Sequence, residues 1–108
     1  MKRGRIGGAL IVLCAAAPAT PAAFAQDGKK IAAGEHVYNN YCFTCHGDRL
    51  VSSGQTFDLR RLRADERPRF ENSVKNGKGQ MPPWKGALSD EEIDQLWHYI
   101  RTITDAKP

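Results

Sequence analysis

The segment Cys42-Phe43-Thr44-Cys45-His46 dictates much of what this 108-residue chain can build. The spacing C-x-x-C-H is typical of covalent attachment of a c-type haem. Two thiols three positions apart can add to the two vinyl groups along one haem edge, and the adjacent imidazole can then bind the iron. A chain of this length also needs such a group, because small domains often depend on a disulfide, a metal or another covalent staple to stabilise a small core.

The first 25 residues have the features of a secretory signal peptide, which is removed from a mature protein. A basic start at residues 2–5 is followed by an apolar run over residues 6–17 and by an A-x-A cleavage site at Ala23-Phe24-Ala25. The apolar run is too short to span a bilayer of about 30 Å. We therefore expect a signal peptide at residues 1–25 and one domain at residues 26–108, located in the periplasm without a membrane anchor.

The charge balance argues against a nucleic-acid-binding protein. The leader carries three of the 16 basic residues and none of the 12 acidic ones, so the remaining chain is nearly neutral. A nucleic-acid-binding domain is usually strongly basic. Basic residues nevertheless concentrate between Arg49 and Lys85, and acidic ones between Leu88 and Asp105. This pattern predicts a dipolar surface whose basic side could steer an acidic partner.

Three other uses of Cys42 and Cys45 remain open on the residues alone. A disulfide between them would close a very short loop and add little stability. A thioredoxin-like site needs a βαβ context, whereas the pattern of this chain is helical throughout. A zinc site needs four ligands, and His36 and His98 do not have the spacing to supply them. An iron–sulfur cluster held by cysteines is excluded, because only two cysteines remain outside the leader.

Met81 is the candidate for the second axial position of a haem iron. It is the only methionine outside the leader, and it lies in the Gly- and Pro-rich segment 77–84, which predicts a loop. The two prolines after it would stiffen the chain behind the thioether, and the glycines before it would let the backbone pass close to a flat macrocycle. The rival ligands are His36 and His98, but both lie on predicted helices among polar neighbours.

From residue 26 onward the chain resembles a small class I cytochrome c. The resemblance rests on Cys42-x-x-Cys45-His46-Gly47, on Met81-Pro82, and on Gly34-x-x-x-Tyr38 paired with Leu96-x-x-Tyr99. It implies an all-α fold in which the N- and C-terminal helices cross around one covalently bound haem c. It also implies that Cys42 and Cys45 attach the haem, and that His46 and Met81 are its axial ligands. A less specific likeness, carried by Met81-Pro82-Pro83-Trp84 and its flanks, is to cytochromes paired with quinoprotein alcohol dehydrogenases.

Apolar periodicity and capping residues predict three helices in this domain. They are expected from Asp27 or Gly28 to Tyr41, from Glu66 to Asn76 with Asp65 as cap, and after Ser89 as N-cap with Glu92 as its reciprocal partner. Gly34 lies on the apolar stripe of the first helix, which indicates a close helix crossing. Residues 48–62 are predicted to form a loop containing at most a short turn.

The chain departs from the class I pattern at one point. Many class I cytochromes have a proline after the haem motif whose carbonyl orients the axial histidine. No proline occurs here between Gly47 and Arg67, and Phe57-Asp58-Leu59-Arg60 has Phe where related cytochromes have Pro. The backbone carbonyl that would orient His46 is therefore left open by the sequence.

These features predict a soluble periplasmic electron carrier rather than an enzyme. If both axial positions are filled by protein, small molecules cannot easily reach the iron. The expected partners are redox proteins, with a quinoprotein (PQQ) dehydrogenase as donor and an oxidase or another cytochrome as acceptor, and the protein is expected to be a monomer. Two alternatives remain: a small haem c subunit of a multi-subunit dehydrogenase, and a haem-based ligand sensor, which requires Met81 to be easily displaced.

Overall fold

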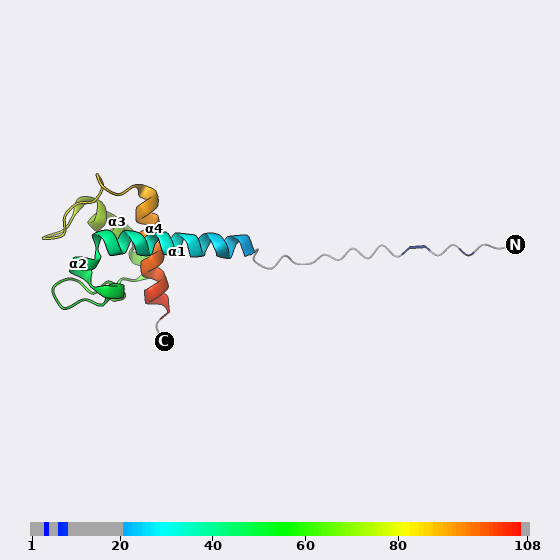
Figure 1. Ribbon diagram of the computed structural model, residues 1–108, viewed down its shortest axis with the longest axis horizontal. Helices are drawn as coiled ribbons and strands as arrows, with labels where there is room; N and C mark the ends of the chain where they lie inside the picture. The colour runs from blue at the N-terminus through cyan, green and yellow to red at the C-terminus, as the bar shows by residue number, and fades with distance from the viewer. Residues whose placement is uncertain (1–3, 5–6, 9–20, 107–108) are drawn as a thin grey trace.

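The structure, a computed structural model, describes residues 4, 7, 8 and 21–106. It contains the helices α1 (Pro21–Tyr41), α2 (Phe43–His46), α3 (Arg67–Asn76) and α4 (Asp90–Asp105). Three short 3₁₀ turns lie between α2 and α3: η1 (Asp48–Leu50), η2 (Leu59–Arg61) and η3 (Ala64–Glu66). The described part of the chain has no strand, so the predicted all-α class is confirmed (Figure 1).

Helix α1 starts earlier than the sequence predicts. It begins at Pro21 rather than at Asp27 or Gly28. The alanines at positions 22, 23 and 25 favour a helix, and a proline is tolerated in the first turn, so the helix runs through the predicted cleavage site. The rest of the predicted signal peptide lies outside the described residues, apart from three isolated glycines. The helix ends at Tyr41, as predicted, and this residue is 41% exposed.

The crossing of α1 and α4 forms the frame of the domain (Figure 1). A Cβ atom on Gly34 would lie 2.0 Å from the backbone oxygen of Gln95 and 2.9 Å from Cβ of Tyr99. Only glycine fits at this point, which confirms the predicted close crossing. Next to it the rings of Tyr38 and Tyr99 pack with their centroids 5.4 Å apart.

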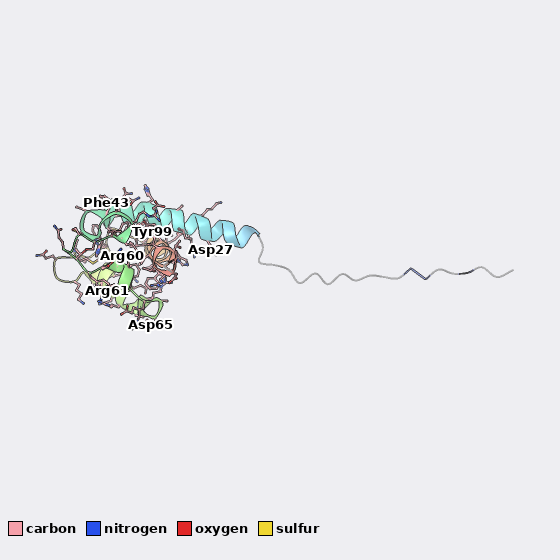
Figure 2. All side chains as sticks on the ribbon, turned by 90° about the horizontal axis from the view of Figure 1, so that it is seen from below. Asp27, Phe43, Arg60, Arg61, Asp65 and Tyr99 are labelled. Atoms are coloured by element: carbon pink, nitrogen blue, oxygen red, sulfur yellow. The ribbon has the colours of Figure 1, made fainter. Side chains whose placement is uncertain are left out.

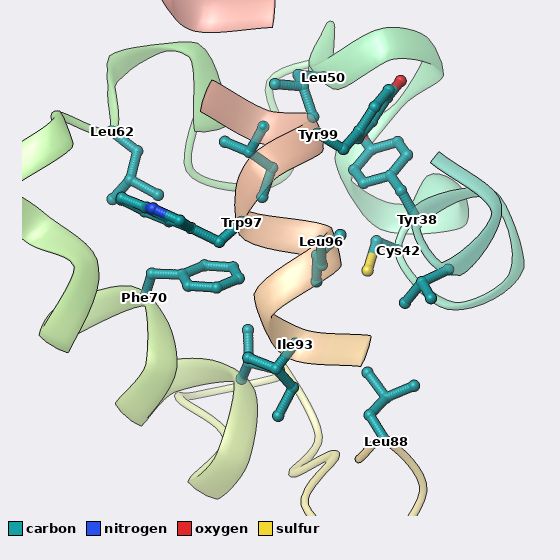
Figure 3. Close-up of a cluster of buried hydrophobic side chains, with 13 residues drawn as sticks. Tyr38, Cys42, Leu50, Leu62, Phe70, Leu88, Ile93, Leu96, Trp97 and Tyr99 are labelled. Carbon is teal, nitrogen blue, oxygen red and sulfur yellow. The ribbon is translucent and has the colours of Figure 1, made fainter. Parts of the chain in front are cut away.

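Helix α4 begins with the predicted capping box. The Ser89 hydroxyl accepts a hydrogen bond from the backbone N–H of Glu92 at 3.1 Å, and the Glu92 carboxylate accepts one from the backbone N–H of Ser89 at 3.0 Å. Together they satisfy two of the free donors at the helix start. The inward face of this helix is the centre of the core (Figure 3). Its buried residues are Ile93, Leu96, Trp97, Tyr99 and Ile100.

Helix α3 ends at Asn76, as predicted, and buries Phe70 and Val74. The predicted cap is wrong, because Asp65 lies inside η3 and pairs with Arg63 at 3.0 Å. The 3₁₀ turn leads directly into α3 and occupies the place where a capping residue would stand. Within residues 48–62 the chain makes two 3₁₀ turns, η1 and η2, rather than the single short turn that the sequence allows.

Candidate haem-binding site

An apolar cavity lies between α1, α3, α4 and the loops around them, with a volume of about 300 Å³. Cys42, His46 and Met81 all line it, although they come from widely separated parts of the sequence. A second cavity of about 230 Å³ shares these three residues. The structure thus brings the sequence-predicted site residues to one place. The remaining wall is mainly apolar and includes Tyr38, Leu59, Leu62, Phe70, Val74, Leu96 and Ile100.

The His46 imidazole is held through hydrogen bonds to the loop that follows η1. The Thr56 hydroxyl donates to the backbone oxygen of Cys45 at 3.0 Å, so its lone pair is free to accept from Nδ1 of His46, 3.3 Å away. The Phe57 backbone carbonyl accepts a further hydrogen bond from the imidazole. This arrangement puts the ring proton on Nδ1 and leaves Nε2 as the nitrogen available to a metal.

Phe57 therefore supplies the backbone carbonyl that the sequence left open. It stands where related cytochromes have proline, and its carbonyl contacts the imidazole in the same role. Burial lowers the pKa of His46, and the hydrogen bond to Phe57 opposes this only in part. The imidazole is consequently neutral at pH 7, which is the form that binds iron.

Met81 lies in a tight hairpin of the loop between α3 and α4. The backbone groups of Lys78 and Met81 hydrogen-bond to each other in both directions at 3.0 Å. The loop is then tied to α3, because the backbone N–H of Trp84 donates to the Val74 carbonyl at 2.8 Å. These backbone hydrogen bonds, before and after Met81, fix the segment that carries the thioether.

Gly77 lets this hairpin fold back against the end of α3. Its φ is +77°, and a Cβ atom there would lie 2.6 Å from the backbone oxygen of Met81 and 3.0 Å from N of Pro83. Gly79 also has a positive φ, +60°, but a Cβ atom there would have nothing within 4 Å. The two glycines thus differ: Gly77 is required for close approach of the methionine segment, and Gly79 only for the turn.

Cys42 directly precedes the short helix α2, Cys45 lies within it, and the two form no disulfide. Cys42 is buried and Cys45 is exposed. Burial raises the pKa of the Cys42 thiol to about 12, whereas redox-active and thiolate-forming cysteines have lowered pKa values. This environment does not favour a thioredoxin-like site.

The rival iron ligands lie away from both cavities. His36 is exposed and contacts Asn40 within α1 at 3.0 Å. Nδ1 of His98 lies 2.8 Å from the backbone oxygen of Asp94 within α4. Among the described residues, no group of three or more His, Cys, Asp or Glu side chains could hold a metal ion such as zinc.

The family model described as "Cytochrome C oxidase, cbb3-type, subunit III" matches residues 29–100, which is about two thirds of the chain. The chain belongs to this family of cytochrome c domains. The family binds a covalent haem c and transfers electrons, and so does this chain. The resemblance to class I cytochromes found in the sequence is thereby confirmed. None of the helices in the described part of the chain is long and apolar enough to cross a membrane.

Curated relatives are of two kinds. Cytochrome c6 of Euglena gracilis is 35% identical over 78 residues, covering 64% of this chain and 87% of that protein. Chloroplastic cytochrome c6 of Chlamydomonas reinhardtii is 35% identical over 95 residues, covering 81% of this chain and 64% of that protein. Quinohemoprotein alcohol dehydrogenase ADH-IIG of Pseudomonas putida is 34% identical over 82 residues. That match covers 74% of this chain but only 11% of the enzyme. No solved structure matches the chain at a significant level.

The residues around the cavity fit a haem. All four predicted residues line the second cavity. The two thiols have the spacing for attachment to the haem vinyl groups, and one imidazole nitrogen with one thioether is an axial donor pair that haem iron uses. Arg69 and Lys78 also line the larger cavity and provide positive charge at its wall. Redox partners follow from the family, since electron transfer requires them.

Sequence reasoning missed several side chains that shape this site. Thr56 has no distinguishing motif, and its role depends on how residues 48–62 fold back onto α2. The function of Gly77 as a cradle for Met81, beyond ending a helix, could be suspected only from its closeness to the methionine loop. Arg69 was counted among the basic residues, but nothing in the sequence places it at the cavity.

Proposed function

We propose that this chain is a periplasmic electron carrier whose single haem c is attached at Cys42 and Cys45 and is axially ligated by His46 and Met81. One observation carries the proposal: His46 and Met81 line the same apolar cavity as Cys42. The bound haem supplies a one-electron iron couple. The chain contributes the two axial ligands, the orientation of the imidazole and an apolar wall that excludes water.

The surroundings of the two ligands would set the reduction potential. A thioether ligand raises the potential relative to stronger donors. An apolar wall raises it further, because burial disfavours the additional charge of the oxidised iron. The hydrogen bond from Nδ1 of His46 acts in the opposite direction, since it makes the imidazole a stronger donor.

Covalent attachment is tested by acid–organic extraction of the purified protein. The colour should remain with the polypeptide in the unaltered protein. Replacing Cys42 and Cys45 by Ala should give a colourless and largely unfolded chain, because the haem staples a small core. Haem that extracts freely from the unaltered protein would contradict the proposed attachment.

Axial ligation by Met81 is tested by the Met81→Ala variant. The weak far-red absorption of an iron–thioether bond should disappear. The potential should fall by a sizeable fraction of the roughly 0.8 V range that axial ligands span. His36→Ala and His98→Ala are the matched controls and should leave both properties unchanged. An unaltered spectrum in Met81→Ala, together with a change in either histidine variant, would reassign the ligand.

Export follows from the predicted signal peptide at residues 1–25. N-terminal sequencing of the protein recovered from the periplasm should begin at Gln26. Cleavage before Gln26 would shorten α1, which starts at Pro21. It would leave the α1–α4 crossing at Gly34 intact, because Gly34 lies further along the helix. Recovery of the haem protein only from the cytoplasm, with Met1 or residue 2 at its start, would overturn this part of the proposal.

The proposed donor is a quinoprotein dehydrogenase, in line with the likeness to quinohemoprotein alcohol dehydrogenases. The small-subunit alternative uses the same observation, since in those enzymes the matching segment is part of a larger chain. Co-purification from the native host distinguishes them. A carrier should elute alone as a monomer, whereas a subunit should elute with a large catalytic chain.

Free positive charge on the domain supports docking to an acidic partner. Several basic residues between Arg49 and Lys85 form ion pairs, including Arg60 with Asp58 at 2.9 Å. Four make none with any described residue: Arg49, Arg61, Lys78 and Lys85. Arg61 lies on the side of the domain away from Asp27 (Figure 2).

The role of these charges is tested by the rate of reduction by the donor. That rate should fall as ionic strength rises, because steering acts on association and is screened by salt. Lys78→Glu and Lys85→Glu should slow it further. Lys29→Glu, in the N-terminal half of α1, is the control and should not. A rate insensitive to salt and to all three changes would assign docking to apolar contacts instead.

A further inference from the structure

The turn that follows His46 has unusual backbone geometry. Gly47 has a φ of +87°, and Arg49 and Leu50, which carry side chains, have φ values of 48° and 69°. Left-handed backbone costs an L-residue roughly 1–2 kcal/mol. It persists only where the surrounding structure holds it in place. The segment Gly47–Leu50 therefore needs a brace.

The hydroxyl of Tyr38 lies at this turn and contacts both of its ends. It donates a hydrogen bond to the Gly47 backbone oxygen at 2.5 Å. The backbone N–H of Leu50 donates to the same phenolic oxygen. One side-chain atom thus bridges the first and the last residue of the Gly47–Leu50 turn.

Burial makes the hydrogen bond to Leu50 the harder one to replace. Tyr38 and Leu50 are both 0% exposed, whereas Gly47 is half-buried. Without the phenolic oxygen, water could reach the Gly47 carbonyl, but the N–H of buried Leu50 would lose its partner. A buried donor or acceptor that loses its partner is costly. The turn would then relax toward ordinary backbone angles.

Such a relaxation would act on His46, because Gly47 follows it directly in the chain. We propose that Tyr38 is a positioning residue for the axial histidine: its hydroxyl holds the Gly47–Leu50 turn and thereby orients the His46 imidazole. This inference rests on the proposed ligation of the iron by His46. It assigns to the phenolic oxygen a role separate from that of the ring, which packs at the helix crossing.

Tyr99 provides a matched control for the ring. Its ring packs against that of Tyr38 in the same cluster (Figure 3). Its side chain is almost as buried, at 3% exposed, and its hydroxyl makes no hydrogen bond with any described residue. Tyr38→Phe and Tyr99→Phe therefore each remove one oxygen from one ring pair, but only Tyr38→Phe removes the brace.

The experiment uses the haem-loaded protein and two readouts other than electron transfer. The first is hydrogen exchange of the Leu50 amide, which should become about tenfold faster in Tyr38→Phe, as expected for loss of one hydrogen bond. The second is the NMR shift pattern of the haem methyl groups and of the His46 ring in the oxidised protein. This pattern reports imidazole orientation and should change in Tyr38→Phe. Tyr99→Phe should match the unaltered protein in both.

Arg49→Gly separates positioning from a general loss of stability. Glycine adopts a φ of 48° without strain, so Arg49→Gly should relax the need for the brace. In the Tyr38→Phe/Arg49→Gly double variant the shift pattern should return toward that of the unaltered protein. If Tyr38→Phe alone fails to take up haem, the double variant carries the test through its recovery of haem binding.

Two results would overturn the inference. One is a Leu50 exchange rate and a methyl pattern in Tyr38→Phe that equal those of the unaltered protein. The other is a defect in Tyr38→Phe that Arg49→Gly does not reduce. Failure of the underlying ligand assignment looks different, because His46 ring signals of the unaltered protein would then lack the shifts of an iron-bound imidazole.

Discussion

The two sides of the haem cavity are held in different ways. On one side the His46 imidazole is fixed by side-chain and carbonyl hydrogen bonds from Thr56 and Phe57. On the other side the thioether of Met81 has no such partner among the described residues, and its position comes from the backbone pairing with Lys78 and from the close approach at Gly77.

This difference follows from the chemistry of the two side chains. An imidazole has a second nitrogen that can be held by hydrogen bonds while the first binds iron. A thioether is only a weak acceptor, so the protein must place it by fixing the backbone on either side. We expect the histidine side to be sensitive to loss of hydrogen-bonding groups and the methionine side to be sensitive to added atoms.

The largest effect should come from breaking the frame on which both sides depend. Gly34→Leu would force its side chain into the Gln95 backbone and should lower the free energy of unfolding by about 3 kcal/mol. Thermal unfolding of the haem-loaded protein measures it. Gly28→Ala is the control in the same helix, since a Cβ atom there has nothing within 4 Å, and it should stabilise slightly. Equal melting of the two variants would remove the crossing argument.

The next effect should be confined to the methionine side. Gly77→Ala would drive a methyl group against the Met81 and Pro83 backbone, and it should cost about 2 kcal/mol and weaken the far-red iron–thioether absorption. Gly79→Ala shares the positive φ but has free space, so it should cost about 1 kcal/mol and keep that absorption. If both variants keep the absorption equally, Gly77 is not a cradle for Met81.

A smaller effect should be confined to the histidine side. Thr56→Val removes one acceptor at Nδ1 of His46, which makes the imidazole a weaker donor to the oxidised iron. The reduction potential should rise by roughly 20–40 mV, because about 59 mV corresponds to a tenfold change for one electron and Phe57 still accepts a bond. Thr102→Val, an exposed change on α4, should leave the potential unchanged. A potential in Thr56→Val equal to that of the control would contradict a role for Thr56.

The smallest effect is the loss of stability at low pH, and it should affect the methionine side of the cavity first. Asp94 of α4 faces Arg67 of α3 at 2.6 Å and Lys30 of α1 at 3.1 Å, with His98 beside it at 3.6 Å. The hydrogen bond from Arg67 is the main reason why the pKa of Asp94 is lowered in the folded protein. A lowered carboxylate pKa stabilises the folded state above the unfolded value of about 3.9, and this contribution is lost as pH falls from there through the folded value.

The Asp94→Asn variant tests that linkage. At neutral pH it should lose about 0.5–1 kcal/mol, as is usual for partly exposed ion pairs. The difference from the unaltered protein should vanish as pH falls below about 4. Because Arg67 belongs to α3, from which the methionine loop continues, the far-red absorption should weaken before the histidine is released. Asp65→Asn, in an exposed pair with Arg63 that does not contact α4, is the matched control and should leave the far-red absorption unchanged.

Most of the frame and the four proposed haem contacts could be predicted from the sequence, because each has a local signature. The motif spacing of Cys42 and Cys45, the capping box at Ser89 and the stripe position of Gly34 depend on residues close together in the chain. The start of α1 at Pro21 could not be predicted, because residues 21–25 are assigned to a signal peptide. A cleavage site does not constrain the backbone, so the helix propensity of these residues decides their structure. The hydrogen bonds made by Tyr38 and Thr56 depend on how the chain folds back after His46, and the periodicity of the sequence carries no information on this.

The central claim is that Met81 and His46 ligate one iron across the cavity they share, and the most direct test needs no substitution. Met81 is the only methionine outside the predicted leader. Mature protein labelled with [methyl-¹³C]methionine should therefore give one methyl signal. In the reduced state that signal should lie strongly upfield, because an axial methionine methyl sits over the haem ring. A methyl signal at the ordinary methionine position in the reduced, haem-loaded protein would contradict the account.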